Sequence, residues 1–151
     1  MSQLIVLDTG VLGMLVHPSE AGEPRECKAW LKQLVLRSAS VHIPEIADYE
    51  LRRELLRMKS EESVRRLDAL KARLTYVPIT TAAMLKAAEH WAMVRGAGRP
   101  TADDKALDGD VILAAQSALL VQAGNELVVA TTNVGHLSQF VDARLWREIA
   151  L

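Results

Sequence analysis

Four side chains with oxygen ligands, far apart in the sequence, are the candidates for chemistry in this chain. Asp8 follows the apolar run Leu4–Leu7, and Glu50 lies in YELRREL. Asp110 opens DVILAAQSALL, and Asn133 follows LVVATT. Oxygen ligands of this kind favour Mg²⁺ or Mn²⁺ over zinc. Divalent cations held by carboxylates can hydrolyse phosphodiesters without a histidine base or a protein nucleophile.

Each candidate acid also has a purely structural interpretation. Asp8 can end a strand or cap a turn, and Glu50 can pair with Arg53. Asp110 would stand in the first turn of a helix, where the helix dipole favours an acid whatever its function, and Asp108 can cap the same helix. The functional interpretation therefore depends on whether the acids converge in space.

The triplet Asp-Thr-Gly at Asp8 is typical of aspartic proteases, but the rest of the chain excludes that class. Such proteases are almost entirely β and need two such triplets, from two lobes or from a symmetric dimer, whereas this chain has one and is dominated by helical patterns. A haloacid-dehalogenase-type phosphatase also begins with a strand and an Asp, but it would place a second Asp where this chain has Gly10. That phosphatase and a non-catalytic binding domain remain the alternatives.

Composition indicates one folded domain spanning residues 1–151. Hydrophobic residues make up 50% and charged residues 25% of the chain, which excludes general disorder. Cys27 is the only cysteine, so an internal disulfide is impossible and a reducing compartment is favoured. No stretch has the form of a signal peptide or approaches the roughly 20 apolar residues of a spanning helix. We expect a soluble cytoplasmic protein that does not contact the membrane.

Charge is unevenly distributed along the chain, although the net charge is only −1. The segment 51–73 has eight basic and four acidic residues, whereas the segment 101–151 has three basic and seven acidic residues. A basic flank beside an acidic centre suits a metal-dependent phosphodiester site. On charge alone, a solvated helix face is the favoured explanation of the basic segment.

Apolar runs and helical spacing alternate along the chain. We predict strands at residues 4–7, 40–44, 75–79 and 125–133, with a short edge strand near Leu145. We predict helices at residues 23–39, 44–58, 59–74, 81–95 and 110–124, the last ending at Gly124 after a polar loop at 96–109. This alternation predicts an α/β fold with a parallel sheet covered on both faces. Ligands bind beyond the carboxyl ends of such strands, where Asp8 and Asn133 would lie.

Four segments in this order resemble the PIN-domain ribonucleases, and most closely the VapC-type toxins of toxin–antitoxin pairs. They are LDTGVLG, IPEIADYELRREL, LDGDVILAAQSALL and LVVATTNVGHLSQF, which together extend from Leu4 to about Phe140. The resemblance implies a three-layer α/β/α sandwich with a central parallel sheet of four to five strands. It also implies Mg²⁺- or Mn²⁺-dependent cleavage of single-stranded RNA, a homodimer, and an antitoxin that inserts an element into the active-site cleft.

The resemblance also implies a role for each candidate residue. Asp8, Glu50 and Asp110 match the three conserved acids that hold the metal, and Asn133 takes the fourth position, which is usually Asp or Asn. Because Asn is neutral, we expect weaker binding of a second metal, for which Asp108 could compensate. We expect supporting hydroxyl groups from Thr9 and Thr131, structural roles for His136 and Phe140, and contacts with RNA phosphates or an acidic antitoxin from Arg52, Arg53 and Arg57.

Overall fold

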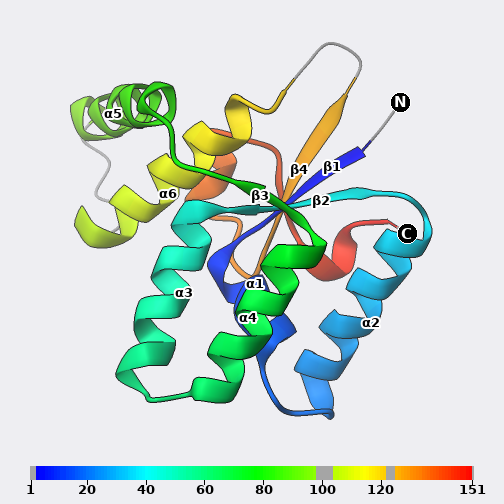
Figure 1. The fold of residues 1–151 in the computed structure, drawn as a ribbon. Helices are drawn as coiled ribbons and strands as arrows, with labels where there is room; N and C mark the ends of the chain where they lie inside the picture. The colour runs from blue at the N-terminus through cyan, green and yellow to red at the C-terminus, as the bar shows by residue number, and fades with distance from the viewer. Residues whose placement is uncertain (1–2, 98–103, 122–124, 151) are drawn as a thin grey trace.

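The computed structural model describes residues 3–97, 104–121 and 125–150, with the backbone alone at 104–106. Along the chain these residues form β1 (Gln3–Leu7), α1 (Thr9–Val16), α2 (Gly22–Leu36), β2 (Ser40–Pro44), α3 (Glu45–Arg57), α4 (Glu61–Arg73), β3 (Thr75–Val77), α5 (Thr81–Gly96), α6 (Asp104–Ala118), β4 (Glu126–Thr131) and β5 (Ala143–Leu145), with short 3₁₀ helices η1 (Leu137–Gln139) and η2 (Trp146–Glu148) (Figure 1). None of these described helices is long and apolar enough to cross a membrane.

The five strands form one parallel sheet in the order β3-β2-β1-β4-β5. Parallel neighbours cannot be joined by tight turns, so the chain crosses over the sheet faces as helices. The predicted α/β class and parallel sheet are confirmed, and β5 is the expected edge strand. The order also places β1 in the centre, so that the chain leaves it toward β2 on one side and later returns to β4 on the other.

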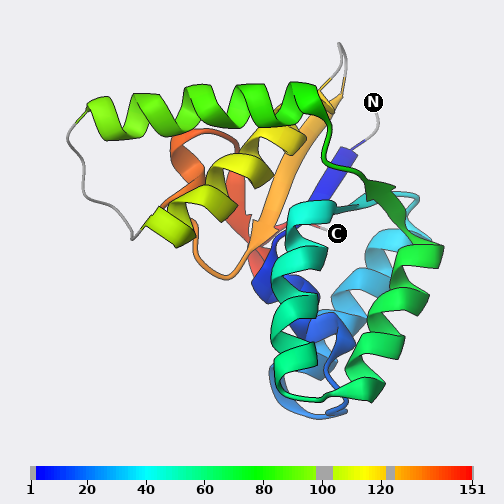
Figure 2. The same cartoon turned by 60° about the vertical axis from the view of Figure 1, so that its left-hand side comes forward.

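Side chains of the central strands alternate between two helical layers. Ile5 and Leu7 of β1 pack in a cluster with residues of α1, α2, α3 and α4, whereas Val6 packs with Leu113 of α6. Helix α5 lies on the outer side of α6 and buries small residues such as Ala83 and Ala87 against it. Figure 2 shows α5 and α6 together on one side of the strands and α1–α4 on the other. The three-layer sandwich is thus the α/β/α arrangement expected.

Helix α1 was not predicted. Its sequence TGVLGMLV is short, apolar on several faces and interrupted by Gly10 and Gly13, and glycine disfavours helix interiors by roughly 0.5–1 kcal/mol relative to alanine. Tertiary packing overrides this preference, because Val11, Leu12, Leu15 and Val16 are all buried. The consequence is that Asp8 is the N-cap of a helix.

Helix α6 begins at Asp104, six residues before the predicted start, and ends at Ala118. The predicted loop at 96–109 is therefore partly helical. Gly124, the predicted end of this helix, lies outside the described residues. Gly109 and Asp108 are inside the helix, so the interpretation of Asp108 as an N-cap is wrong. Asp110 likewise lies beyond the first turn. This corrected register decides which side chains of α6 share a face.

Candidate functional site

The carboxyl ends of β1 and β4 lie side by side at the point where the strand order reverses, which is where open α/β sheets bind ligands. Asp8 directly follows β1, and Thr131 is the last residue of β4. The hydroxyl of Thr131 donates to Asp8 Oδ2 at 2.6 Å, and the backbone N–H of Thr9 donates to Asp8 Oδ1 at 2.7 Å. Both carboxylate oxygens of Asp8 are therefore fixed by neighbouring donors, as expected for Thr131.

Glu50 reaches the same place from α3. The hydroxyl of Thr9 donates to Glu50 Oε1 at 2.8 Å, across a sequence separation of 41 residues. Thr9 thus binds Asp8 through its backbone N–H and Glu50 through its side chain. This double contact fixes the two carboxylates relative to each other, which is the orienting role predicted for Thr9.

Asp110 completes a group of three acids in one open cleft of about 550 Å³. The acids come from three elements: the end of β1, the middle of α3 and the second turn of α6. The residues that line the cleft are Asp8, Thr9, Gly10, Gly13, Glu50, Leu51, Arg53, Glu54 and Asp110. The predicted convergence of Asp8, Glu50 and Asp110 is therefore present, and Arg53 lies with them.

The three carboxyl groups all ionise less readily than free ones. Burial raises the pKa of Asp8 against the hydrogen bonds from Thr131 and Thr9. Burial and the nearby charge of Asp8 also raise the pKa of Glu50. Burial, followed by repulsion from Asp8 and Glu50, raises the pKa of Asp110 to about 6, although His136 opposes this. A bound cation would relieve this repulsion.

The donor set fits a hard divalent cation. Among the described residues, no three carboxylate, imidazole or thiol groups form a cluster that could hold a metal ion by itself. Mg²⁺ does not need one, because it binds through one or two carboxylates and completes its shell with waters and substrate phosphates. An open cleft with oxygen donors from Asp8, Glu50 and Asp110 is compatible with that mode of binding.

Asn133 and Asp108, the two other predicted ligands, point elsewhere. The side-chain Oδ1 of Asn133 accepts the N–H of Gly135 at 3.0 Å, and its backbone N–H donates to Thr131 Oγ1 at 3.1 Å. Asn133 is exposed and does not line the acidic cleft. Asp108 lines an apolar groove between α5 and α6, because two residues along a helix turn it away from the face of Asp110.

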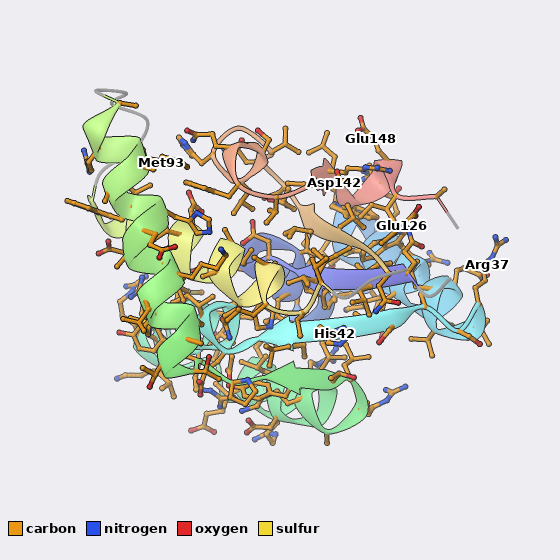
Figure 3. All side chains as sticks on the ribbon, turned by 90° about the horizontal axis from the view of Figure 1, so that it is seen from above. Arg37, His42, Met93, Glu126, Asp142 and Glu148 are labelled. Carbon is orange, nitrogen blue, oxygen red and sulfur yellow. The ribbon has the colours of Figure 1, made fainter. Side chains whose placement is uncertain are left out.

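Of the three arginines predicted to contact RNA or an antitoxin, one lies at the cleft and two do not. Arg52 is held by Asp48 and Asp68, and Arg57 is held by Glu54, so neighbouring acids already pair with these two arginines. Arg53 alone of the three predicted arginines lines the cleft. The acids of the C-terminal segment do not all lie at the cleft. Asp110 lines it, whereas Glu126, at the start of β4, and Asp142 line a different pocket. Figure 3 shows Glu126, Asp142 and Glu148 on the side of the view away from Met93 of α5.

Gly109 and Gln116, which were not predicted from the sequence, position the acids. A side chain at the buried Gly109 would overlap Glu50 Oε2, so glycine lets α6 approach α3 here. The fully buried Gln116 accepts the N–H of Ile46, in the first turn of α3, at 3.3 Å and donates to Val77 O at 2.8 Å. It thereby caps α3 from α6 and joins the helices that carry Glu50 and Asp110. The only sequence signal was a glycine and a glutamine within an apolar helix.

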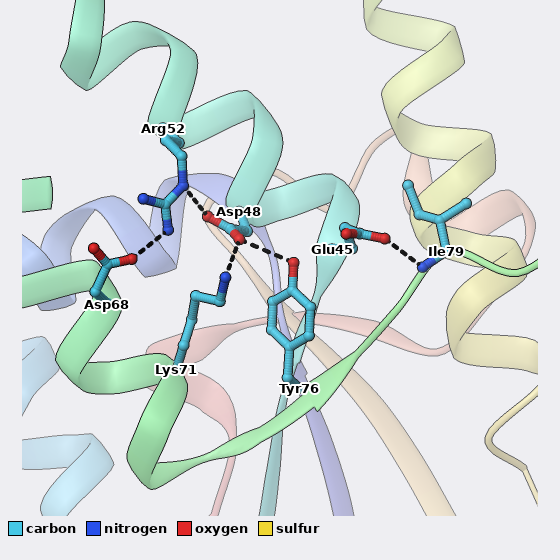
Figure 4. A network of polar contacts seen from close by, with 7 residues as sticks. All are labelled: Glu45, Asp48, Arg52, Asp68, Lys71, Tyr76 and Ile79. Carbon is cyan, nitrogen blue, oxygen red and sulfur yellow. Dashed lines mark hydrogen bonds and ion pairs between the residues drawn. The ribbon is translucent and has the colours of Figure 1, made fainter.

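A second acidic side chain of α3 has a different environment (Figure 4). Asp48 accepts hydrogen bonds from Arg52 at 3.0 Å and from Tyr76 at 2.9 Å, and it pairs with Lys71 at 2.9 Å. Burial opposes its ionisation, but the bonds from Lys71, Tyr76 and Arg52 outweigh burial and lower the pKa of Asp48. This network fastens α3 to α4 and β3.

Comparison with known proteins supports the resemblance. The chain is similar in structure to VapBC2 from Rickettsia felis bound to a DNA fragment from its promoter, with a TM-score of 0.72, 16% identity, and coverage of 95% of this chain and 98% of that chain. It is also similar to DNA-bound VapBC from Salmonella typhimurium (TM-score 0.70, 18% identity, 97% and 99% coverage) and to VapBC-1 from nontypeable Haemophilus influenzae (TM-score 0.69, 16% identity, 96% and 99% coverage).

At these identities the similarity establishes the fold alone. Comparison with curated protein sequences gives no match. The sequence profile of the PIN domain matches residues 5–133. This span contains Asp8, Glu50 and Asp110 and ends at Asn133, after β4. The chain therefore belongs to the PIN domain family, with a fold like that of the VapC-type toxins.

Proposed function

We propose that this protein is a Mg²⁺- or Mn²⁺-dependent endoribonuclease that cleaves single-stranded RNA. The observation that carries the proposal is the meeting of Asp8, Glu50 and Asp110 in one cleft, each with a raised pKa. Membership of the PIN domain family supports a nuclease. The site also has oxygen donors from the end of β1 and from helices α3 and α6, which suits a hard cation and a phosphodiester.

The residues of the cleft divide the work of such a reaction. Asp8, Glu50 and Asp110 would hold the metal, which when bound supplies an activated water and neutralises charge on the phosphate. Thr131 and Thr9 keep the oxygens of Asp8 in place, and Thr9 does the same for Glu50. Arg53, on the wall of the cleft, provides a guanidinium for the RNA backbone.

The two alternative classes fit the site less well. A phosphatase of the haloacid-dehalogenase type needs a second aspartate two residues after the first, where this chain has Gly10. A non-catalytic domain would have no reason to keep three acids of raised pKa together in an open cleft, since clustered carboxylates destabilise the fold unless a ligand uses them. The neutral Asn133 does not count against the group of three acids, because its side chain accepts the N–H of Gly135 within its own turn.

Partners follow from the same resemblance. The structural neighbours are VapBC proteins, so we propose that this chain is the toxin of such a pair and binds an antitoxin. We also propose a homodimer formed through the groove between α5 and α6, where Met84 and Trp91 are 47% and 39% exposed. Light scattering of the purified protein tests the dimer, and co-purification with the product of the adjacent gene tests the antitoxin.

The proposed activity is tested with end-labelled single-stranded RNA, double-stranded RNA and single-stranded DNA of one sequence. Internal cleavage of the single-stranded RNA is expected with Mg²⁺ or Mn²⁺ and is expected to disappear with EDTA. Cleavage that persists in EDTA would contradict metal dependence. Cleavage of none of the three substrates with either metal would favour the non-catalytic class.

A further inference from the structure

Two large aromatic side chains of the described residues are exposed, and they differ in their surroundings. Tyr49 is 56% exposed on α3, and Trp91 is 39% exposed on α5. Each has an arginine over its ring: Arg53 Cζ lies 5.0 Å from the centre of Tyr49, and Arg95 Cζ lies 5.7 Å from that of Trp91. Trp91 lies in the apolar groove with residues such as Met84. Tyr49 does not line that groove.

Arg53 connects Tyr49 to the acidic cleft. Its side chain lines the cleft together with Asp8, Glu50 and Asp110, and its guanidinium also covers the ring of Tyr49, one helical turn away. Tyr49 directly precedes Glu50 in the sequence. Among the ion pairs of the described residues, acids hold Arg52 and Arg57 but not Arg53. The outer face of α3 therefore presents a cation and then an aromatic ring as it leads away from the carboxylates.

A cation beside an exposed aromatic ring is the combination that binds single-stranded nucleic acid. The cation contacts the backbone, and an unpaired base stacks on the ring, whatever its sequence. A base needs only one ring face, and more than half of the surface of Tyr49 remains exposed with Arg53 in place. A base within a duplex is already stacked on both sides, so this arrangement discriminates in favour of single strands.

We propose that Tyr49 and Arg53 form a subsite for an unpaired nucleobase next to the scissile phosphate, with Arg53 on the backbone and Tyr49 stacked on the base. This inference rests on the proposed ribonuclease function and extends it with a structural basis for the preference for single-stranded RNA. A docking surface for a protein is the other use of an exposed tyrosine. The guanidinium contact and the position beside the cleft favour the RNA strand.

Three variants of α3 test the proposal through RNA binding and cleavage. Tyr49→Ala removes the ring, Tyr49→Phe keeps the ring without the hydroxyl, and Leu56→Ala removes another exposed apolar side chain of the same helix, 60% exposed. We expect Tyr49→Ala to raise KM about 10-fold, the effect of one lost stack, with little change in kcat. Tyr49→Phe and Leu56→Ala are expected to stay within about twofold of the wild type. Equal losses for Tyr49→Ala and Tyr49→Phe would overturn the stacking role.

An abasic nucleotide placed in turn at each position around the mapped cleavage site separates RNA from protein contacts. At one position the wild type is expected to lose affinity while Tyr49→Ala loses nothing further, because both changes remove the same stack. If Tyr49→Ala is additive with the abasic nucleotide at every position, the ring does not contact a base. Fluorescence anisotropy of the same oligonucleotides gives this answer even if no cleavage occurs, so failure of the subsite and failure of the ribonuclease function are distinguishable.

Discussion

Asp48 and Glu50 lie two residues apart on α3, yet their surroundings shift their pKa values in opposite directions. Asp48 is 5% exposed and is surrounded by Lys71, Arg52 and Tyr76, which lower its pKa. Glu50 faces Asp8 and Asp110 across an open cleft, and its pKa is raised. Where an acid supports the fold, the chain provides the opposite charge. Where the acids meet in the cleft, Arg53 and His136 do not offset burial and mutual repulsion, and a bound cation would.

The comparison also separates stability from activity. Removing a charge from the Asp48 network should destabilise the fold and leave the cleft able to bind a cation. Removing a charge from the cleft should relieve repulsion and weaken cation binding. Four predictions test this separation.

The largest effect is expected for Asp110→Asn. Loss of a charged ligand should lower the metal-dependent cleavage rate by at least about 100-fold, since even supporting residues of metal sites cost 10–100-fold. Its stability in EDTA should be equal to or higher than that of the wild type, because the repulsion with Asp8 and Glu50 is reduced. Asp108→Asn, two residues away on the other face of α6, is the control and should keep full activity. An active Asp110→Asn would remove Asp110 from the site.

Asp48→Asn should act mainly on stability. It leaves Lys71 and Arg52 without their shared counter-charge, and breaking a buried ion pair costs about 3–5 kcal/mol. Because these two cations are 30% and 27% exposed, water reduces the cost, and we expect about 2 kcal/mol. Urea denaturation measures the loss. Asp68→Asn, at the exposed end of the network, is the control. If it lowers the free energy of unfolding as much as Asp48→Asn does, the burial of Asp48 is not the cause of the loss.

Gly109→Ala tests whether close packing of α6 on α3 places Glu50. A methyl group there would overlap Glu50 Oε2 and displace the carboxylate. We expect a loss of activity of about 10-fold, in the range for displaced supporting groups. The free energy of unfolding should be unchanged or higher by up to about 1 kcal/mol, because alanine favours a helix over glycine. Denaturation and cleavage measured on the same preparation decide this, and full activity would show that Glu50 need not remain in place.

The smallest effect concerns pH in the metal-free protein. The pKa of Asp110 is raised from its ordinary value near 4 to about 6. The folded state therefore binds a proton more readily than the unfolded state, and this group destabilises the fold above about pH 6. As pH falls from 7 toward 4, wild type should gain stability relative to Asp110→Asn. The lowered pKa of Asp48 has the opposite sign, since its contribution is lost as pH falls through the folded-state pKa. If the difference in melting temperature between wild type and Asp110→Asn does not change with pH, the raised pKa of Asp110 is contradicted.

Most of the fold was predictable because parallel sheets leave a strong local signal. The runs that became β1 and β4 end at polar residues and the run that became β2 ends at Pro44, and parallel order alone brings Asp8 to the same edge as the end of β4. Helix α1 was not predictable from its glycines and apolar residues, because only packing stabilises it. The start of α6 was missed because Gly109 resembles the end of a loop.

The site was predicted as far as chain order allows. Asp8, Glu50 and Asp110 were identified by position in a resembling pattern, and the structure brings them together. The orientation of Asn133 depends on a turn closed by Gly135, and the orientation of Asp108 depends on helix register. Gln116 and Gly109 act across α3 and α6, so no local pattern reveals their contacts.

Calorimetric titration with Mn²⁺ is the most direct test of a cation site formed by Asp8, Glu50 and Asp110. Wild type and Asp48→Asn are expected to bind Mn²⁺ with similar affinity while folded, and Asp110→Asn is expected to bind at least about 10-fold more weakly. Equal binding by wild type and Asp110→Asn, or no binding by wild type, would contradict the site.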